Sequence, residues 1–128
     1  MAGLVRGERR RGGIRWSKVP ALAGIFIHSV HIAPDGALWI GAEHRLVARF
    51  DPQMGQVQWF GAAEGLQGSM ASALHFDREQ RLWVGTDAGL FLAKAPYKRF
   101  VRVRLVPFSI VWAIADGSDG TVWAGGSA

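Results

Sequence analysis

The chain has 128 residues, 49% of them hydrophobic, so it is long and apolar enough to pack one domain, and its lack of cysteine excludes disulfides, thiolate metal sites and cysteine nucleophiles. The formal net charge of +5 is carried by residues 1–18, and the rest of the chain holds nine basic and nine acidic side chains. Because residues 19–128 are electrically balanced, no nucleic-acid partner is expected.

The first 18 residues are predicted to form a basic, solvated and disordered leader, apart from a leading outer strand near residues 14–17. Contact with phosphate or anionic lipid is the alternative. Residues 19–27 are apolar, but they are far shorter than the roughly 20 residues of a membrane-spanning helix, and Pro20 and Gly24 interrupt them. No convincing small-residue cleavage site follows, so we predict neither a membrane segment nor an export signal within this chain.

A four-residue signature recurs three times, at intervals of 44 and 40 residues: Leu38-Trp39-Ile40-Gly41, Leu82-Trp83-Val84-Gly85 and Val122-Trp123-Ala124-Gly125. Nine positions before each tryptophan stands an aliphatic residue: Val30, Leu74 and Ile114. An aromatic residue stands 23 or 24 positions before each of them: Trp16, Trp59 and Phe100. Agreement at several fixed spacings distinguishes a structural repeat from a chance motif.

Each repeat is predicted to fold into four short strands. The first strands lie near residues 25–32, 70–76 and 110–116, the second strands carry the signature, the third strands lie at 46–50 and 90–94, and the fourth at 56–60 and 97–105. A tryptophan buries a large area, and a glycine lets an adjacent backbone approach closely. We therefore expect the repeated residues of the signature to pack neighbouring sheets together: Trp39, Gly41, Trp83, Gly85, Trp123 and Gly125.

Four strands in about 40 to 45 residues are typical of a propeller blade. The sequence thus predicts an all-β fold, a partial β-propeller of about two and a half four-stranded antiparallel blades at residues 25–60, 70–105 and 110–128. A closed ring needs about four to eight blades, so this ring is incomplete. The remaining blades would come from a larger chain or from self-association, and the chain is a truncated product, an interior fragment or one unit of an assembled ring.

One repeat is close to a known pattern: Ser72-Ala73-Leu74 followed by Arg81-Leu82-Trp83-Val84-Gly85-Thr86-Asp87-Ala88-Gly89-Leu90, with Glu64-Gly65-Leu66 before it. It resembles the two-component regulator propeller repeat, and the likeness covers roughly residues 13–128. Ala42 and Arg45 depart from the pattern, which has Thr and Gly there. The resemblance implies the periplasmic, ligand-sensing propeller of a hybrid histidine kinase, often one for carbohydrate-derived signals, with any kinase activity outside this chain.

Propellers bind ligands mainly at the mouth of the central channel, where the connections between fourth and first strands and between second and third strands meet. The polar residues of those connections are our candidates for contacting a small-molecule or carbohydrate ligand: Glu43, His44, Glu64, Gln67 and Asp87. The alternative is that they are ordinary solvated loop residues. Trp112 occupies a position where the other repeats have His28 and Ser72, so it is predicted either to stack on a sugar ring or to fill the core.

No constellation of nucleophile, base and orienting group is recognisable, so neither catalysis nor a cofactor is predicted. His31 and His75 occupy equivalent positions, but they belong to different blades and lack a third ligand, so no metal site is expected. Two alternatives to a sensor stay open: a propeller lyase of the streptogramin type, and a structural propeller that docks a protein partner.

Overall fold

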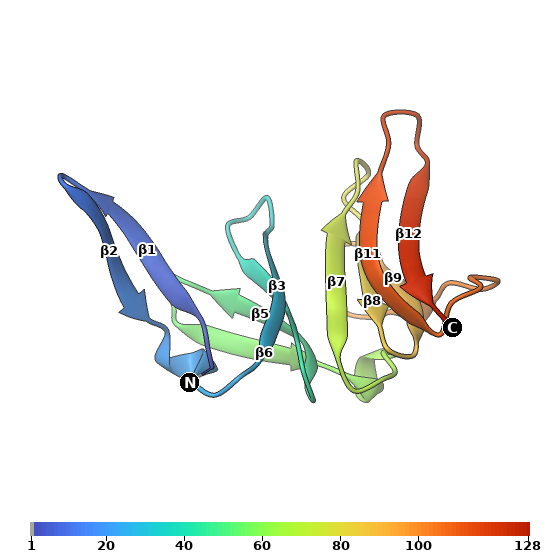
Figure 1. Cartoon of the computed structure of the whole chain (residues 1–128), viewed down its shortest axis with the longest axis horizontal. Helices are drawn as coiled ribbons and strands as arrows, with labels where there is room; N and C mark the ends of the chain where they lie inside the picture. The colour runs from blue at the N-terminus through green and yellow to red at the C-terminus, as the bar shows by residue number, and fades with distance from the viewer. Residues whose placement is uncertain (1) are drawn as a thin grey trace.

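The computed structural model describes residues 2–128, which form twelve β-strands and two short 3-10 turns. The strands make four antiparallel sheets, with four strands in each of two sheets and two strands in each of the others. Figure 1 shows the sheets following one another along the molecule in chain order. The all-β fold and the partial propeller expected from the repeat are therefore confirmed.

Blade 1 consists of β3 (Ile27–Ile32), β4 (Leu38–Ala42), β5 (Leu46–Asp51) and β6 (Gln56–Phe60), each paired with the next. Blade 2 repeats this order with β7 (Ala71–Phe76), β8 (Leu82–Thr86), β9 (Gly89–Ala93) and β10 (Val101–Arg102). β10 is shorter than the predicted strand at 97–105, because the N–H of Phe100 donates to the carbonyl of Glu64 at 2.7 Å and its buried ring packs with blade 1.

The half-blade at the end of the chain consists of β11 (Ile110–Asp116) and β12 (Val122–Ser127), paired antiparallel. The three signature tryptophans occupy equivalent rungs, since Trp39 pairs with His31, Trp83 with His75, and Trp123 with Ala115. Their exposed fractions nevertheless rise from 1% to 9% to 67% along the chain. Trp39 and Trp83 each have a following sheet to pack against, whereas the face of Trp123 is open within the described residues.

Neighbouring blades approach closely at the signature glycines. A methyl group added to Gly41 would stand 2.6 Å from the carbonyl oxygen of Ala71 in the next blade, and one added to Gly85 would stand 2.8 Å from the side chain of Val111. Both glycines thus lie where an atom of the next blade comes close to the backbone. Around Gly125 no atom of residues 2–128 lies within 4 Å of the equivalent point.

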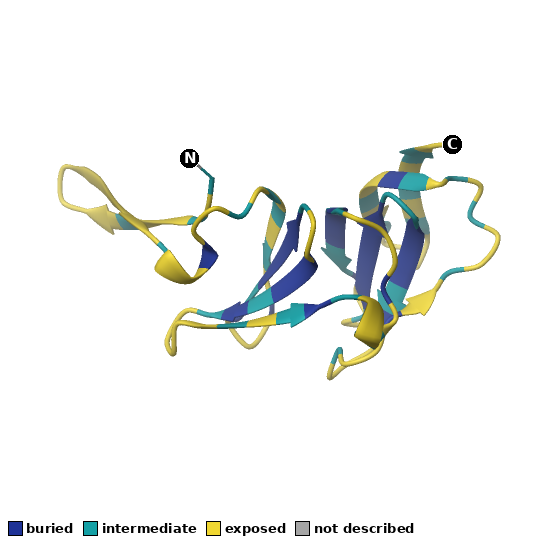
Figure 2. Ribbon diagram, turned by 90° about the horizontal axis from the view of Figure 1, so that it is seen from below, coloured by how far each residue is buried: buried dark blue, intermediate teal, exposed yellow. Residues whose placement is uncertain are grey.

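The disorder expected for the basic leader is corrected by the structure. β1 (Val5–Arg10) and β2 (Gly13–Lys18) form an antiparallel hairpin that extends away from blade 1 (Figure 1). Gly12 and Gly13, both at positive φ, allow the tight reversal, and the ring of Trp16 lies over Gly7 on the opposite strand. Pairing of the two strands satisfies their backbone N–H and C=O groups, an effect that charge composition does not report. The hairpin remains almost wholly exposed (Figure 2).

The largest core cluster lies between blades 1 and 2, and Figure 2 shows the buried residues concentrated on these two sheets. Trp39 stacks on Phe60 with ring centroids 5.2 Å apart and meets Phe76 and Tyr97 edge-on. The opposite face of blade 1 is covered by Leu22, which is fully buried, together with other apolar residues of the N-terminal segment. That segment therefore covers part of the face where a preceding blade would pack.

Candidate functional site

The connections predicted to form a binding mouth do meet in the structure. Glu43, in the turn between β4 and β5, forms an isolated bridge with Met70 just before β7. The next residue, His44, donates its N–H to the carbonyl of Ser69 at 2.5 Å. Asp87, in the turn between β8 and β9, contacts the same stretch, since its carboxylate accepts from Ser69 and Met70. We call this end of the blades the mouth face.

A hollow of about 480 Å³ opens on the mouth face between blades 1 and 2. Its walls come from the turn after β4, the end of β6 and the 61–68 connection, and they include His44, Arg45, Trp59, Gly61, Leu66 and Gln67. The guanidinium of Arg45 lies 4.1 Å from the centre of the Trp59 ring, close enough for a cation–π contact. The hollow thus offers a half-buried aromatic surface, a cation and an exposed imidazole in one place.

Beside this hollow a carboxylate stands between two histidines. The Oε1 atom of Glu43 is 3.3 Å from Nε2 of His28, and its Oε2 atom is 3.9 Å from Nε2 of His44. His28 belongs to β3, the first strand of blade 1, and His44 has a left-handed backbone with φ of 69°. The His44 side chain is 82% exposed and is therefore accessible to a ligand.

Three of the predicted ligand-binding residues, Glu64, Gln67 and Asp87, already have hydrogen-bond partners within the protein. Glu64 accepts the N–H of Gly61 at 2.6 Å and so caps the 3-10 turn Ala62–Glu64. The side-chain oxygen of Gln67 accepts from Arg102 at 2.5 Å. These contacts hold the 61–70 connection in place, which is a structural role.

Asp87 holds the same connection most firmly. Its carboxylate accepts from the Ser69 hydroxyl at 2.5 Å, the Ser69 N–H at 2.8 Å and the Met70 N–H at 3.2 Å. Desolvation acts to raise the pKa of Asp87, but the hydrogen bonds from Ser69 and Met70 outweigh it, so this pKa lies below its usual value. The charged carboxylate is thus the form that the loop stabilises.

Trp112 lies outside the hollow. It stands on β11 at a bulge in the β11–β12 pairing, with an exposed ring whose Nε1 donates to the hydroxyl of Ser127 at 3.3 Å. Of the six predicted residues, His44 and Gln67 therefore share the hollow, Glu43 lies next to it, and Glu64 and Asp87 support it. Sequence reasoning missed His28, Arg45 and Trp59; the departure of Arg45 from the repeat pattern was the available signal.

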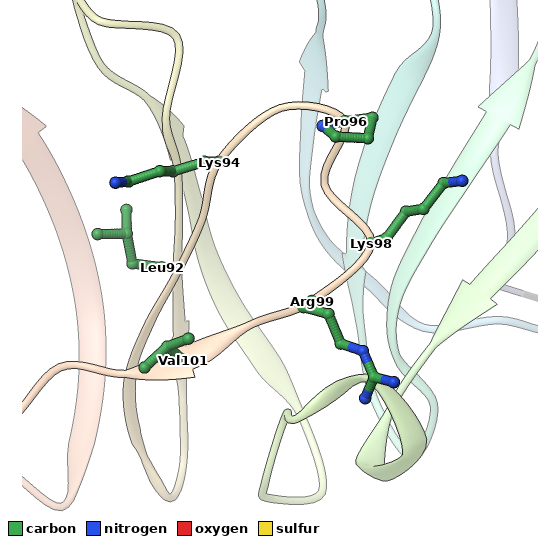
Figure 3. A pocket seen from close by; sticks show the side chains of 6 residues that line it. All are labelled: Leu92, Lys94, Pro96, Lys98, Arg99 and Val101. Carbon is green, nitrogen blue, oxygen red and sulfur yellow. The ribbon is translucent and has the colours of Figure 1, made fainter.

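A second hollow, of about 580 Å³, lies on the outer strands of blade 2 (Figure 3). It is lined by Leu92, Lys94, Pro96, Lys98, Arg99 and Val101. Figure 3 shows Lys94 and Lys98 pointing in opposite directions, and Arg99 donates to the carbonyl of Ala63 at 3.3 Å. Because the charged groups diverge, they do not converge on a single ligand.

Within residues 2–128, no three histidine, aspartate or glutamate side chains are grouped so that they could hold a metal ion. No helix among the same residues is long and apolar enough to cross a membrane.

Comparison with solved structures identifies the fold. The extracellular domain of BT3049 from B. thetaiotaomicron, provisionally described as part of a hybrid two-component system, matches 77% of this chain with a TM-score of 0.68 and 23% identity. The extracellular domain of BT4673 from the same organism, described in the same way, matches 98% with a TM-score of 0.75 and 19% identity. A protein provisionally described as a gluconolactonase matches 95% with a TM-score of 0.62 and 20% identity.

These likenesses establish the fold, and they agree with the two-component regulator propeller family that the repeat signature resembles. The chain spans 14% of the BT3049 domain, 18% of the BT4673 domain and 49% of the gluconolactonase-like protein. No family model matches the sequence, and no curated protein does. The chain thus has the fold of a portion of the extracellular domains of two-component systems.

Proposed function

We propose that this chain is part of a ligand-sensing β-propeller, in the periplasmic or extracytoplasmic portion of a two-component regulatory system. The observation that carries the proposal is the hollow on the mouth face, where the ring of Trp59 from β6 comes together with the guanidinium and the imidazole of Arg45 and His44 from the β4–β5 turn. Concave sites with a few convergent polar groups are where propellers and other scaffolds hold small molecules. The likeness to extracellular domains of two-component systems supports the same reading.

The lining favours a carbohydrate that carries a carboxylate. The half-exposed ring of Trp59 offers a face on which a sugar ring can stack, and Arg45 can pair with an anionic substituent. Glu43 and His44 at the rim can exchange hydrogen bonds with sugar hydroxyls. Because Glu64, Gln67 and Asp87 are hydrogen-bonded to other residues of the protein, we assign them to holding the hollow open.

The test is calorimetric titration of the chain with uronic-acid and neutral oligosaccharides. We expect the acidic sugars to bind more tightly, and Trp59→Leu to weaken binding by about tenfold or more, since stacking and burial on an aromatic ring contribute of the order of 1–2 kcal/mol. Arg104→Ala, a change at an exposed position away from the hollow, is the matched control. Equal weakening by both variants, or no binding of any sugar, would argue against a sugar site here.

We also propose that the chain itself is not an enzyme. The hollow contains an imidazole and a guanidinium, and Glu43 lies next to it, yet none of the described groups shows the paired arrangement of nucleophile, base and orienting residue. A lactonase and a streptogramin-type lyase are the enzymatic alternatives, because one structural neighbour is provisionally described as a gluconolactonase. If the chain turns over a lactone or a streptogramin, and if this activity is lost in Glu43→Gln, the chain is an enzyme and not a sensor. Capture of a protein partner through the mouth face would favour the docking alternative.

A further inference from the structure

The residues that bury Trp39 show which positions of two adjacent blades form an interface around a signature tryptophan. The ring of Trp39 is buried by Phe60 of its own blade and by Phe76 and Tyr97 of the next blade. Phe76 ends the first strand of blade 2, and Tyr97 lies in the connection between its third and fourth strands. Trp39 is therefore covered by three aromatic residues, each at a definite place in the repeat.

At the N-terminal end of the chain, apolar residues at the corresponding places are exposed. Ile32 ends β3 opposite Leu38, as Phe76 ends β7 opposite Leu82, and it is 73% exposed. Trp16 stands six residues before the buried Leu22, as Phe60 stands six before the buried Leu66, and is 63% exposed. Met54, in the β5–β6 connection, is 67% exposed.

The C-terminal end of the chain presents the other side of such an interface. Trp123 occupies the rung of Trp39 but is 67% exposed. Gly125 occupies the place of Gly41 and Gly85, where the following strand comes within 3 Å, and it is open. The C-terminal end thus displays a tryptophan and a glycine that lack a following blade within residues 2–128, and the N-terminal end displays the residues that such a blade would contribute.

The free strand edges match in the same way. β2 leads through the 3-10 turn Pro20–Leu22 into β3, as β6 leads through Ala62–Glu64 into β7, so the β1–β2 hairpin corresponds to the third and fourth strands of a blade. β11 and β12 are the first and second strands of a blade. In both complete blades the second strand pairs with the third. Among the described strands, β12 and β1 each have one unpaired edge.

We propose that two copies of this chain associate head to tail, so that β12 of one copy pairs with β1 of the other and Trp123 is buried against Trp16 and Ile32 of the other copy. Addition of a strand to an open sheet edge is a common mode of recognition. Two copies of residues 2–128, with twelve strands each, supply the strands of six four-stranded blades, and a propeller ring usually has about four to eight. Three copies would give nine blades, outside that range.

Charge gives this association a characteristic salt dependence. The hairpin face turned away from Trp16 carries Arg6, Arg10 and Arg15 with only Glu8 as a counter-charge. In the closed ring this face would lie over the outer strands of blade 2, on the side to which Lys94 points, whereas Lys98 points the opposite way (Figure 3). Like charges repel and salt screens them, so the dimer becomes tighter as salt is added. Non-specific ionic association would become weaker.

Sedimentation velocity of the 128-residue chain tests the proposal. We expect a discrete species of about twice the 13.9 kDa mass, which dissociates on dilution and becomes tighter as salt is raised. Gly125→Val should weaken dimerisation about tenfold or more, because the added side chain blocks close approach of a strand, while the open space around Gly125 leaves the monomer fold intact. Ala128→Val, beyond the end of β12, is the matched control.

Mixing two variants tests the head-to-tail geometry. Gly125→Val disables only the C-terminal end, and Ile32→Asp disables only the N-terminal end at an exposed position. Each variant alone should stay monomeric, whereas the mixture should form a heterodimer through its one intact interface. The proposal fails if the unaltered chain stays a monomer at all concentrations, if it forms only polydisperse aggregates, if Ile32→Asp alone still dimerises, or if the mixture stays monomeric. Circular dichroism of each variant shows whether it is folded.

Discussion

Gly41 and Ala71 are in direct backbone contact across the boundary between blades 1 and 2. The carbonyl oxygen of Ala71 lies where a side chain on Gly41 would have to stand, at 2.6 Å. Gly41→Ala should therefore push β7 away from β4 and lower the free energy of unfolding by about 1–3 kcal/mol, measured by urea denaturation at low protein concentration. The matched variant Gly125→Ala should change it by less than about 0.5 kcal/mol, and equal effects would contradict the proposed role of the glycine.

The same contrast applies to the tryptophans two residues earlier. Trp39 is 1% exposed and packs with Phe60, Phe76 and Tyr97, so Trp39→Ala should lower the free energy of unfolding by about 3–5 kcal/mol or prevent folding. Trp123 is 67% exposed, so Trp123→Ala should leave the dilute monomer almost unchanged. Thermal unfolding followed by far-ultraviolet circular dichroism compares the two. A large loss of monomer stability in Trp123→Ala would mean that its rung is covered within the chain.

The repeat signature was sufficient to predict the blades, because the ring and the glycine of Leu-Trp-x-Gly suit a strand that packs closely against a following sheet, as the strands of Trp39 and Trp83 do. The outer strand predicted near residues 14–17 is present as β2, but the disorder expected for the rest of the first 18 residues is not found within residues 2–18, because charge composition does not report the pairing of β1 with β2. The prediction was also too long for β10, because the long-range bond from Phe100 to Glu64 competes with pairing to β9. Local pattern predicts a strand, and tertiary contacts set its length.

The mouth face was predictable in position but not in detail. Propeller topology places Glu43, His44 and Asp87 at one end of the blades, and the structure brings their loops into contact. The sequence does not reveal that Asp87 is bonded to Ser69, because the two residues are 18 positions apart and belong to different connections. Nor does it reveal that Arg45 would lie over Trp59, which repeat analysis had counted as a structural aromatic.

Stability should fall in acid, and the buried carboxylate of Asp77 should contribute to this loss. Burial acts to raise the pKa of Asp77, but bonds from the Trp83 indole at 2.8 Å and from Arg81 at 2.7 and 2.9 Å outweigh it, so the pKa lies below 3.8. A group whose pKa is lower in the folded chain stabilises it above the unfolded value, and this stabilisation is lost as pH falls through the lower, folded value. Urea denaturation between pH 7 and pH 3 should show the decline.

A substitution at Asp77 shows how much of the loss of stability in acid comes from this carboxylate. Asp77→Asn should lower stability at pH 7 and make it less dependent on pH, because the amide cannot titrate and accepts fewer hydrogen bonds. Glu8→Gln, in the exposed hairpin, is the control and should leave the profile as it is. An unchanged profile in Asp77→Asn would assign the acid sensitivity to other carboxylates, such as Asp116, whose pKa is lowered chiefly by its bond to His75.

Asp87 and Glu43 both lie on the mouth face, but their substitutions should have different effects. The carboxylate of Asp87 accepts three hydrogen bonds from Ser69 and Met70, so Asp87→Ala should lower the free energy of unfolding by about 1–3 kcal/mol and speed amide exchange at Ser69 and Met70. Glu43 contacts only half-exposed or exposed imidazoles, so Glu43→Gln should leave both quantities nearly unchanged. If exchange at Ser69 is unaltered in Asp87→Ala, the connection is held by other contacts, and Asp87 is free to bind a ligand directly.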